Sequence, residues 1–349
     1  MKRPLLKRRL IQAKEIEGEP CLYLHRSLQR SIRDTTAKDH AQRQVVFEQA
    51  LNIVRKVFPL SSPIQVPEPS SWREHLKLLP HVMSLQSAFV EARGGIRGGR
   101  KFASLLSDAG INQWARGFTR DGLLLLETAE QVLNEISSDD SRSFDDSDIM
   151  RADINAIIAL MHDNTGISTR AEGLKKRRIA LDIRKKRTES LAQVTRNEEI
   201  LLYNAWLDYA ISLLQYNRYQ EAEPILINCL EKYRQWGTPE QIPFEYAKYE
   251  HKMAFVRMYQ GRYDEALELG QLGVQHMDNT GNEALMLRFK FDLACIHLQR
   301  GDADKALEMH KEVLDTRIVV CGKVNENTLQ SYYAVGALHE LRGEFAEAE

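Results

Sequence analysis

The sequence predicts an all-α fold, a solenoid of antiparallel helix hairpins, on the strength of three observations. A motif of Asn or Gly followed five residues later by Ala occurs four times in the C-terminal half, at intervals of 44, 40 and 42 residues. A second small residue precedes each of these alanines by 12 residues. Apolar residues recur at helical spacing between the small ones. One helix pair repeated in this way is typical of a stacked solenoid.

The spacing of the small residues follows from the geometry of a helix hairpin. Gly or Asn permits the backbone conformation that the turn requires. Two helices that pack at ~8–10 Å need small side chains where they cross, and one small residue on each helix meets that need. The repeat signature consists of Ala210, Ala222, Ala254, Gly261, Ala266, Ala294, Gly301, Ala306, Gly336, Gly343 and Ala348.

This signature resembles that of the tetratricopeptide repeat (TPR), and the resemblance covers about residues 200–349. It implies a right-handed superhelix whose inner groove receives a protein or peptide. The period near 42 is similar to the repeats of kinesin light chains and of fungal immune-type receptors. Ala303 replaces the aromatic residue of the pattern. Pro224 lies near the start of a second helix and leaves that helix boundary open, because proline is tolerated only in the first turn.

Two further units are expected to precede these repeats. One contains Ala159, Gly166 and Ala171, which repeat the 12-residue step, and the other contains Gly110 and Gly122 around Gly117. We therefore predict an array over residues 102–349 with about five to six repeats, interrupted by a mobile acidic connector at 137–148.

The last repeat is expected to be truncated, because Glu349 falls at the beginning of its second helix. A natural solenoid ends in a polar cap, which favours a fragment. The helix predicted at 327–342 would then expose four apolar side chains to solvent. They are Leu329, Tyr332, Val335 and Leu338.

The N-terminal part has a different pattern. Residues 1–35 are predicted to form a small winged-helix remnant, with two short strands around the Glu17–Gly18 turn and a helix after them. Residues 36–92 are predicted to form a helical linker domain. It contains a proline-rich extended connector from Pro59 to Pro69, an N-cap at residue 70 or 71 and a kink at Pro80. A glycine-rich hinge at 93–101 follows.

The order of motifs in this part resembles a segment of fungal NLR-like (STAND) proteins that joins an NB-ARC or NACHT ATPase to a TPR sensor. The resemblance is carried by His25-Arg26-Ser27-Leu28-Gln29, Phe58-Pro59, Trp72 and Leu79-Pro80-His81-Val82. It implies that His25 and Arg26 occupy a nucleotide-sensing box, although Arg26 replaces the aspartate of the family. ATP or ADP would then bind only in a full-length parent protein.

Composition and motif searches argue against other functions. The formal net charge of −1 predicts no nucleic-acid partner and no membrane partner, and the scattered cysteines favour a cytoplasmic location. The single Gly-Lys pair at 322–323 is followed by Val324 and is no P-loop. Gly343 stands where a zinc motif would need its second histidine. We expect no enzyme activity, no cofactor and no metal site.

The basic run at residues 175–187 contains eight Lys or Arg residues. Because these residues circle the predicted helix, a solvated helix face is the favoured interpretation. A nuclear-import signal or an anion site is the alternative.

The predicted function is therefore that of a protein–protein interaction scaffold, the sensor and linker region of a fungal NLR-like receptor without its ATPase. The alternative is a freestanding kinesin-light-chain-like adaptor. Lys252 and Asp292 lie four residues after the cations of two first helices, which argues against a Lys–Asn carboxylate clamp. For the aromatic members of the groove set, a core position is the alternative. The groove candidates are Asn204, Leu207, Ile211, Lys248, His251, Phe255, Met258, Arg288 and Phe291, with Cys295 beside them.

Overall fold

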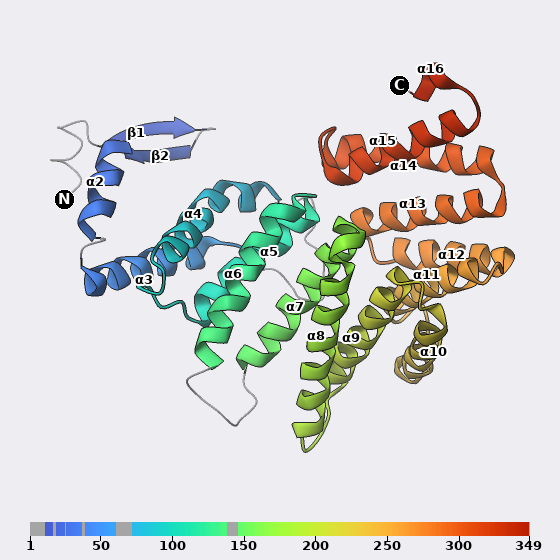
Figure 1. The fold of residues 1–349 in the computed structure, drawn as a ribbon, viewed down its shortest axis with the longest axis horizontal. Helices are drawn as coiled ribbons and strands as arrows, with labels where there is room; N and C mark the ends of the chain where they lie inside the picture. Colours follow the sequence, from blue (N-terminus) through green and yellow to red (C-terminus); the bar gives the residue numbers. More distant parts are fainter. Residues whose placement is uncertain are drawn as a thin grey trace. The chain divides into compact units, whose positions relative to one another are not determined.

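The computed structural model describes residues 11–16, 19–24, 26–36, 39–60, 72–137 and 146–348, and Figure 1 shows its ribbon. The chain divides into two compact units. One unit comprises Met1–Val57 and His81–Gly98, and the other comprises Phe58–Pro80 and Gly99–Glu349.

The first unit begins with the expected pair of strands. Strands β1 (Ile11–Ile16) and β2 (Glu19–Leu24) pair antiparallel, and helices α2 (Arg26–Thr36) and α3 (His40–Val57) follow. Helix α4 (Trp72–Glu91) belongs to this unit from His81 onward, and its residues up to Pro80 belong to the second unit. Pro80 lies inside α4. The predicted proline-rich connector and its N-cap fall largely on residues 61–71, outside the described residues, as does His25.

Buried apolar side chains lie on α3 and on the second half of α4. Phe47 and Leu51 on α3 and Leu85 and Phe89 on α4 are all buried. The Gln44 side chain accepts a hydrogen bond of 2.8 Å from the Arg97 amide and donates one of 3.1 Å to the Arg97 carbonyl. These bonds hold the glycine-rich segment that follows α4 against α3 within this unit.

The second unit contains a continuous array of antiparallel helix hairpins, which confirms the predicted fold class. Each second helix packs on the first helix of the next hairpin, and the first helices α5, α7, α9, α11 and α13 contact one another in sequence. The hairpins are α5 (Arg100–Ala115) with α6 (Thr119–Ser137), α7 (Asp146–Thr165) with α8 (Arg170–Ser190), α9 (Arg196–Gln215) with α10 (Tyr219–Trp236), α11 (Pro243–Tyr259) with α12 (Tyr263–Asp278), α13 (Glu283–Arg300) with α14 (Ala303–Cys321), and α15 (Glu326–Leu341) with α16 (Phe345–Ala348).

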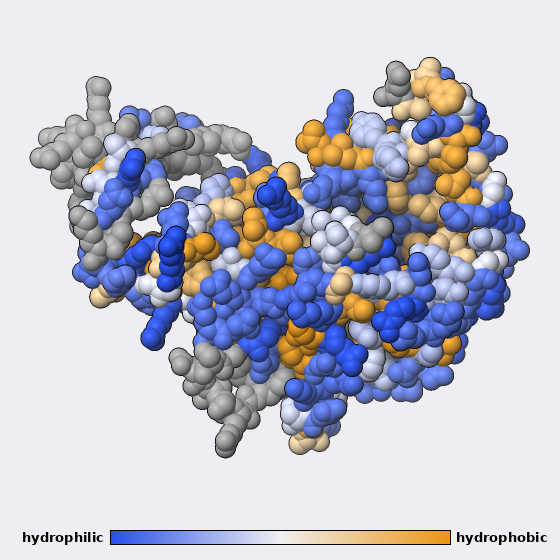
Figure 2. Space-filling view, viewed as in Figure 1, coloured by the Kyte–Doolittle hydropathy of each residue, from blue (hydrophilic) through white to orange (hydrophobic). Residues whose placement is uncertain are grey.

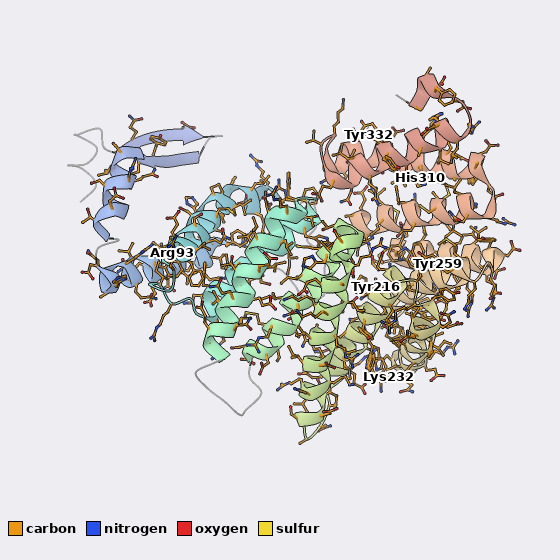
Figure 3. All side chains as sticks on the ribbon, in the orientation of Figure 1. Arg93, Tyr216, Lys232, Tyr259, His310 and Tyr332 are labelled. Carbon is orange, nitrogen blue, oxygen red and sulfur yellow. The ribbon has the colours of Figure 1, made fainter. Side chains whose placement is uncertain are left out.

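Small residues lie where the helices of a hairpin cross. Ala210 and Ala222 are fully buried in one core cluster, and Ala254 and Ala266 are fully buried in another. The turn after α9 places Asn217 at φ 57°, a left-handed conformation that asparagine tolerates better than most residues. Tyr216 directly follows the last residue of α9, and Tyr259 is the last residue of α11 (Figure 3).

The α7–α8 hairpin differs from the prediction in register. Ala171 is exposed, and Gly173 packs against α7 in its place, where an added Cβ would lie 3.2 Å from the Ala159 carbonyl oxygen. A 3-10 turn at Ile167–Thr169 lengthens this connection. The step from small residue to small residue is therefore 14 residues here and not 12.

Helix α15 buries one of the four apolar side chains that were expected to face solvent. Leu338 is 2% exposed and packs with Ala306 and Leu307, and Val335 packs against the same cluster. Leu329 and Tyr332 are exposed as expected. Hydrophobic side chains therefore still reach the surface over the last helices (Figure 2). Pro224 lies inside α10, beyond the first turn of that helix.

Replacing Gly122 with alanine is expected to destabilise the protein by about 1–3 kcal/mol, because the crossing of α5 and α6 has no space for a methyl group. An added Cβ would lie 2.8 Å from the backbone oxygen of Gly110. In an unconstrained helix the same change would stabilise by about 1 kcal/mol, so the sign of the effect is diagnostic. Urea denaturation measures it, with Glu127→Ala on the exposed face of α6 as control. A more stable Gly122→Ala protein would contradict the crossing geometry.

Candidate functional site

The first helices present two rows of polar side chains at fixed offsets from their buried small residues. Six residues before Ala159, Ala210, Ala254 and Ala294 stand Asp153, Asn204, Lys248 and Arg288, all half-buried. Two residues before the last three of these alanines stand Asp208, Lys252 and Asp292, also half-buried. Because the first helices lie side by side, these seven residues form one surface, which we call the inner face.

The part of the inner face over α7, α9 and α11 lines a small cavity of about 80 Å³ with both polar and apolar walls. Lys248 Nζ lies 3.3 Å from Asn204 Oδ1 and 3.7 Å from Asp208 Oδ1. Asp153 is paired with Arg184 of α8. Burial raises the pKa of Asp153 in spite of this pairing. Contacts within and between repeats therefore already satisfy much of the charge in this part.

The part over α11 and α13 is richer in cations. His251 Nε2 lies 2.8 Å from Asp292 Oδ2. Burial opposes the charge of Asp292, but the hydrogen bond from His251 and the charges of Arg288 and Lys252 outweigh it and lower the pKa of Asp292 to about 2. Burial and the Arg288 cation lower the pKa of Lys252 to about 7. Asp292 is therefore an ionised carboxylate that lies among several basic side chains.

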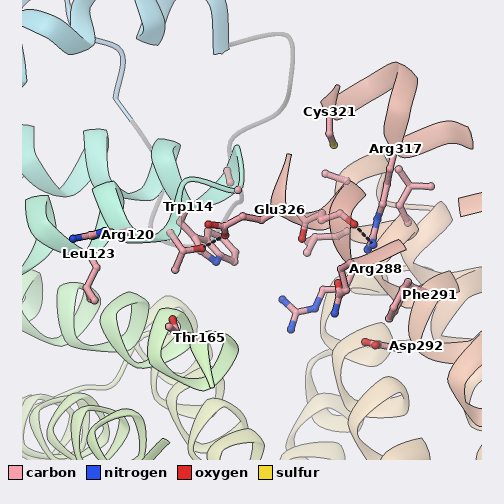
Figure 4. Close-up of a pocket in the computed structure, with 18 residues that line it drawn as sticks. Trp114, Arg120, Leu123, Thr165, Arg288, Phe291, Asp292, Arg317, Cys321 and Glu326 are labelled. Carbon is pink, nitrogen blue, oxygen red and sulfur yellow. Dashed lines mark hydrogen bonds between the residues drawn. The ribbon is translucent and has the colours of Figure 1, made fainter. Parts of the chain in front are cut away.

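A larger cavity of about 600 Å³ opens at this end of the inner face (Figure 4). One wall consists of the α5–α6 turn with Trp114, Arg120 and Leu123, and the other consists of α13, α14 and α15 with Arg288 and Arg317. Arg317 is buried and fixed, since it donates bonds of 2.8 Å to Asn327 O and to Ser331 Oγ and lies over the Phe291 ring.

The two walls of the larger cavity touch each other directly. Thr119 Oγ1 donates a hydrogen bond of 2.6 Å to Glu326 Oε2, and Asn325 Nδ2 donates one to the Arg116 carbonyl. Gly117 packs against Asn325, where an added Cβ would lie 2.8 Å from Asn325 Oδ1. We call this set the closing contact. It joins segments more than 200 residues apart in the sequence.

The predicted groove residues are distributed over the surface and the core. Asn204, Lys248 and Arg288 lie on the inner face. Leu207 is fully buried and belongs to the core, so its prediction as a groove residue is wrong. His251 and Phe291 are also buried. These three residues stand three positions before the crossing alanines, where the helix turns toward packed neighbours.

The remaining candidates are half-buried and contact the core or a neighbouring helix. Ile211 and Phe255 pack against one apolar cluster and Met258 against the next. The Cys295 sulfur lies 3.9 Å from His310 Nε2, and burial raises the pKa of its thiol to about 12. Such a thiol stays protonated and is a poor nucleophile.

The favoured interpretation of the basic run as a solvated face is wrong for two of its arginines. Arg177 and Arg184 are buried, and Arg177 Nη1 donates a bond of 3.0 Å to Asp208 Oδ2. Lys176 bonds Glu130 of α6. Arg178 is the contrasting case, since its side chain is 63% exposed. Lys176 and Arg177 therefore join successive repeats, and Arg184 pairs with Asp153 within its own hairpin.

Sequence reasoning missed Asp153 and Asp208 on the inner face. Their signal is the constant offset from the crossing alanines, by which Asp153 aligns with Asn204 and Asp208 aligns with Lys252. No group of three or more His, Cys, Asp or Glu side chains within the described ranges could hold a metal ion. No helix in the described part of the chain is long and apolar enough to cross a membrane.

Comparison with known proteins identifies the repeats. A family model described as tetratricopeptide repeat matches residues 245–318 and 283–349. No curated protein sequence matches the chain significantly. The C-terminal part of the chain therefore consists of tetratricopeptide repeats, and the fold is that of a TPR-like α-solenoid.

Several solved structures are similar to this fold at low sequence identity. NprR in complex with its cognate peptide NprX is 14% identical, with a TM-score of 0.56 over 88% of this chain and 74% of that chain. A putative kinesin light chain from Podospora anserina is 18% identical, with a TM-score of 0.40 over 56% and 87%. A STAND protein with a TPR sensor from Pyrococcus horikoshii is 17% identical, with a TM-score of 0.41 over 99% of this chain and 50% of that chain.

Proposed function

We propose that this chain is a protein-interaction scaffold whose inner face binds a segment of another polypeptide. The observation that carries the proposal is the pair of polar rows, of which one continues over α7, α9, α11 and α13 and the other over α9, α11 and α13. Grooves lined by helices of this kind receive extended peptides or partner helices. NprR, which has a similar fold, was solved with a bound peptide.

The charges of the inner face favour an acidic ligand. Toward α7 and α9 the rows contain Asp153 and Asp208, which are neutralised by neighbouring cations. Toward α11 and α13 they contain Lys248, Lys252 and Arg288 beside Asp292. A ligand carboxylate would bind best at the second end, where basic side chains outnumber acidic ones.

Within this class we propose the sensor and linker region of a fungal NLR-like receptor, with a freestanding kinesin-light-chain-like adaptor as the alternative. The motif order from residue 25 to residue 82 supports the receptor, as do the strand pair and helices of the N-terminal unit. Sequencing the full transcript tests the choice. An upstream P-loop in the same reading frame would support the receptor, and an upstream heptad coiled coil would support the adaptor.

Selection from a displayed peptide library tests the binding proposal directly. Peptides enriched on the full chain should contain Asp or Glu, and Lys248→Glu should weaken their affinity about tenfold, because it places a negative charge on the inner face. Lys305→Glu is the matched control, since Lys305 is exposed on α14, outside the inner face. Equal loss of affinity in both variants, or no enrichment over beads alone, would refute the proposal.

A further inference from the structure

The cavity of about 600 Å³ has walls that come from opposite ends of the array. Its size lies in the range of small-molecule sites. A ligand inside it would contact the α5–α6 turn and the α13–α15 region at once, and these segments already meet at the closing contact. Occupation of the cavity and closure of the array are therefore physically linked.

The lining of the cavity combines apolar surface with an excess of positive charge. Trp114, Leu123 and Phe291 contribute apolar and aromatic surface. Three guanidinium groups, those of Arg120, Arg288 and Arg317, line it together with two carboxylates, those of Asp292 and Glu326. Both carboxylates already accept hydrogen bonds, Asp292 from His251 and Glu326 from Thr119.

Arg317 is held in place before any ligand arrives. Its bonds to Asn327 O and Ser331 Oγ fix the guanidinium group, and the Phe291 ring supports it from one side at 4.9 Å. A buried cation that is already oriented binds an anion at a smaller entropic cost than a mobile surface lysine does.

We infer that the cavity binds a ligand with an apolar body and a single anionic head, and that this ligand holds the α5–α6 turn against the α14–α15 turn. The head lies between Arg288 and Arg317, and the apolar body lies against Trp114 and Leu123. The ligand is either a free amphipathic acid or the acidic end of a bound polypeptide. This inference deepens the proposed function. It rests on that function only if the ligand is the acidic end of a bound polypeptide.

Binding and closure must then stabilise each other. A ligand that contacts both walls has a higher affinity for the closed array, and by linkage it shifts the array toward closure. Weakening the closing contact should therefore weaken binding, even when the changed residue leaves the guanidinium groups in place.

Two fluorescent dyes test the ligand class without any partner protein. The probe 1-anilinonaphthalene-8-sulfonate has an apolar body with one anionic head, and N-phenyl-1-naphthylamine is its neutral counterpart. The sulfonate should bind the full chain about tenfold more tightly than the neutral dye, the effect of one charge-assisted hydrogen bond. Arg288→Gln should reduce this difference, because only the Arg317 guanidinium group then remains beside the head. Arg300→Gln, at the exposed end of the same helix, should leave it unchanged.

Hydrogen exchange tests closure on the same samples. Asn325→Asp keeps the oxygen that accepts from the Asn327 amide but replaces the donor to the Arg116 carbonyl with a carboxylate. It should speed amide exchange at residues 116–120 and weaken sulfonate binding. Asn282 is the N-cap of α13, and its side-chain oxygen accepts a hydrogen bond from the Leu285 amide. Asn282→Asp is therefore the control, and it should change neither the amide exchange at residues 116–120 nor the sulfonate binding.

The outcomes separate this inference from the proposed function. Equal affinity of the two dyes, or an Arg288→Gln protein that prefers the sulfonate as strongly as the unmodified protein does, would overturn the inference and leave the peptide selection unaffected. Displacement of the dye by decanoate but not by decanol would identify a free acid. Displacement by a leucyl-phenylalanyl-leucine peptide but not by its amide would identify a chain terminus.

Discussion

Replacing Arg177 with alanine is expected to lower the free energy of unfolding by about 3–5 kcal/mol, the usual effect of removing one partner from a buried ion pair. Arg177 is 3% exposed. Its Nη1 donates to Asp208 Oδ2 at 3.0 Å, and its Nε lies 4.0 Å from Asp163 Oδ2. Asp163 is itself buried and accepts a bond from Ser212. Without Arg177 this carboxylate loses its nearest cation.

The loss should depend on pH in a defined direction. Burial raises the pKa of Asp163, and Arg177 is the largest influence that opposes this rise. In the alanine variant the pKa of Asp163 therefore rises further. Since the unfolded chain ionises this group normally, the destabilisation should grow as the pH increases above the ordinary range of an aspartate and shrink at low pH.

Two further variants separate the ion pair from simple truncation. Arg178→Ala removes a neighbouring arginine that is exposed and paired with Asp182, and it should change the stability little. Adding Asp163→Asn to Arg177→Ala should restore part of the lost stability, because the buried charge is removed together with its partner. Chemical denaturation followed by circular dichroism measures all three proteins. A similar effect of Arg177→Ala and Arg178→Ala would contradict the network.

The hairpins could be predicted from the sequence because helix crossings impose a local rule. Only small residues allow two helices to approach closely, so Ala210 and Ala222 determine the register of their own hairpin without information from the rest of the chain. The rule failed at Gly173, where a short 3-10 turn changed the connection length. A change of two residues in a turn leaves no periodic signal in the sequence.

Whether a side chain of a first helix faces the groove or the core was harder to predict, because such a helix has three kinds of neighbour. It contacts its partner helix, the preceding hairpin and the following first helix, so little of its surface faces solvent. Leu207 and His251 occupy equivalent positions and are both buried, although one is apolar and the other titratable. Hydrophobicity alone could not separate such positions from those of Asn204 and Lys248.

Pairings between repeats were beyond sequence reasoning for a related reason. The bond between Arg177 and Asp208 depends on how one hairpin is rotated against the next, and the closing contact depends on that rotation accumulated over the whole array. Neither quantity is encoded in the composition of one helix. The basic run therefore suggested a solvated face, whereas Arg177 holds successive repeats together and Arg184 bonds Asp153 within its own hairpin.

Acidification from pH 6.5 to pH 4 is expected to destabilise the repeats that contain α11 to α14 by about 3 kcal/mol for each of two histidines. Burial, aided by Lys252 and Arg288, lowers the pKa of His251 to about 4 against the influence of Asp292. Burial, aided by Arg317, lowers the pKa of His310 to about 4 as well. In the unfolded chain each histidine takes up a proton near pH 6.5, whereas in the folded chain it does so near pH 4. The unfolded state therefore binds more protons between pH 6.5 and pH 4, and the stability falls as the pH is lowered.

Glutamine substitutions test this expectation while keeping polar side chains at both sites. In His251→Gln the amide can still donate to Asp292, but the side chain no longer titrates. His251→Gln and His310→Gln should each remove about half of the stability lost between pH 6.5 and pH 4, as measured by urea denaturation at several pH values. If both variants lose stability with acid as steeply as the unmodified protein does, then these histidines are not what makes the array sensitive to acid in this range.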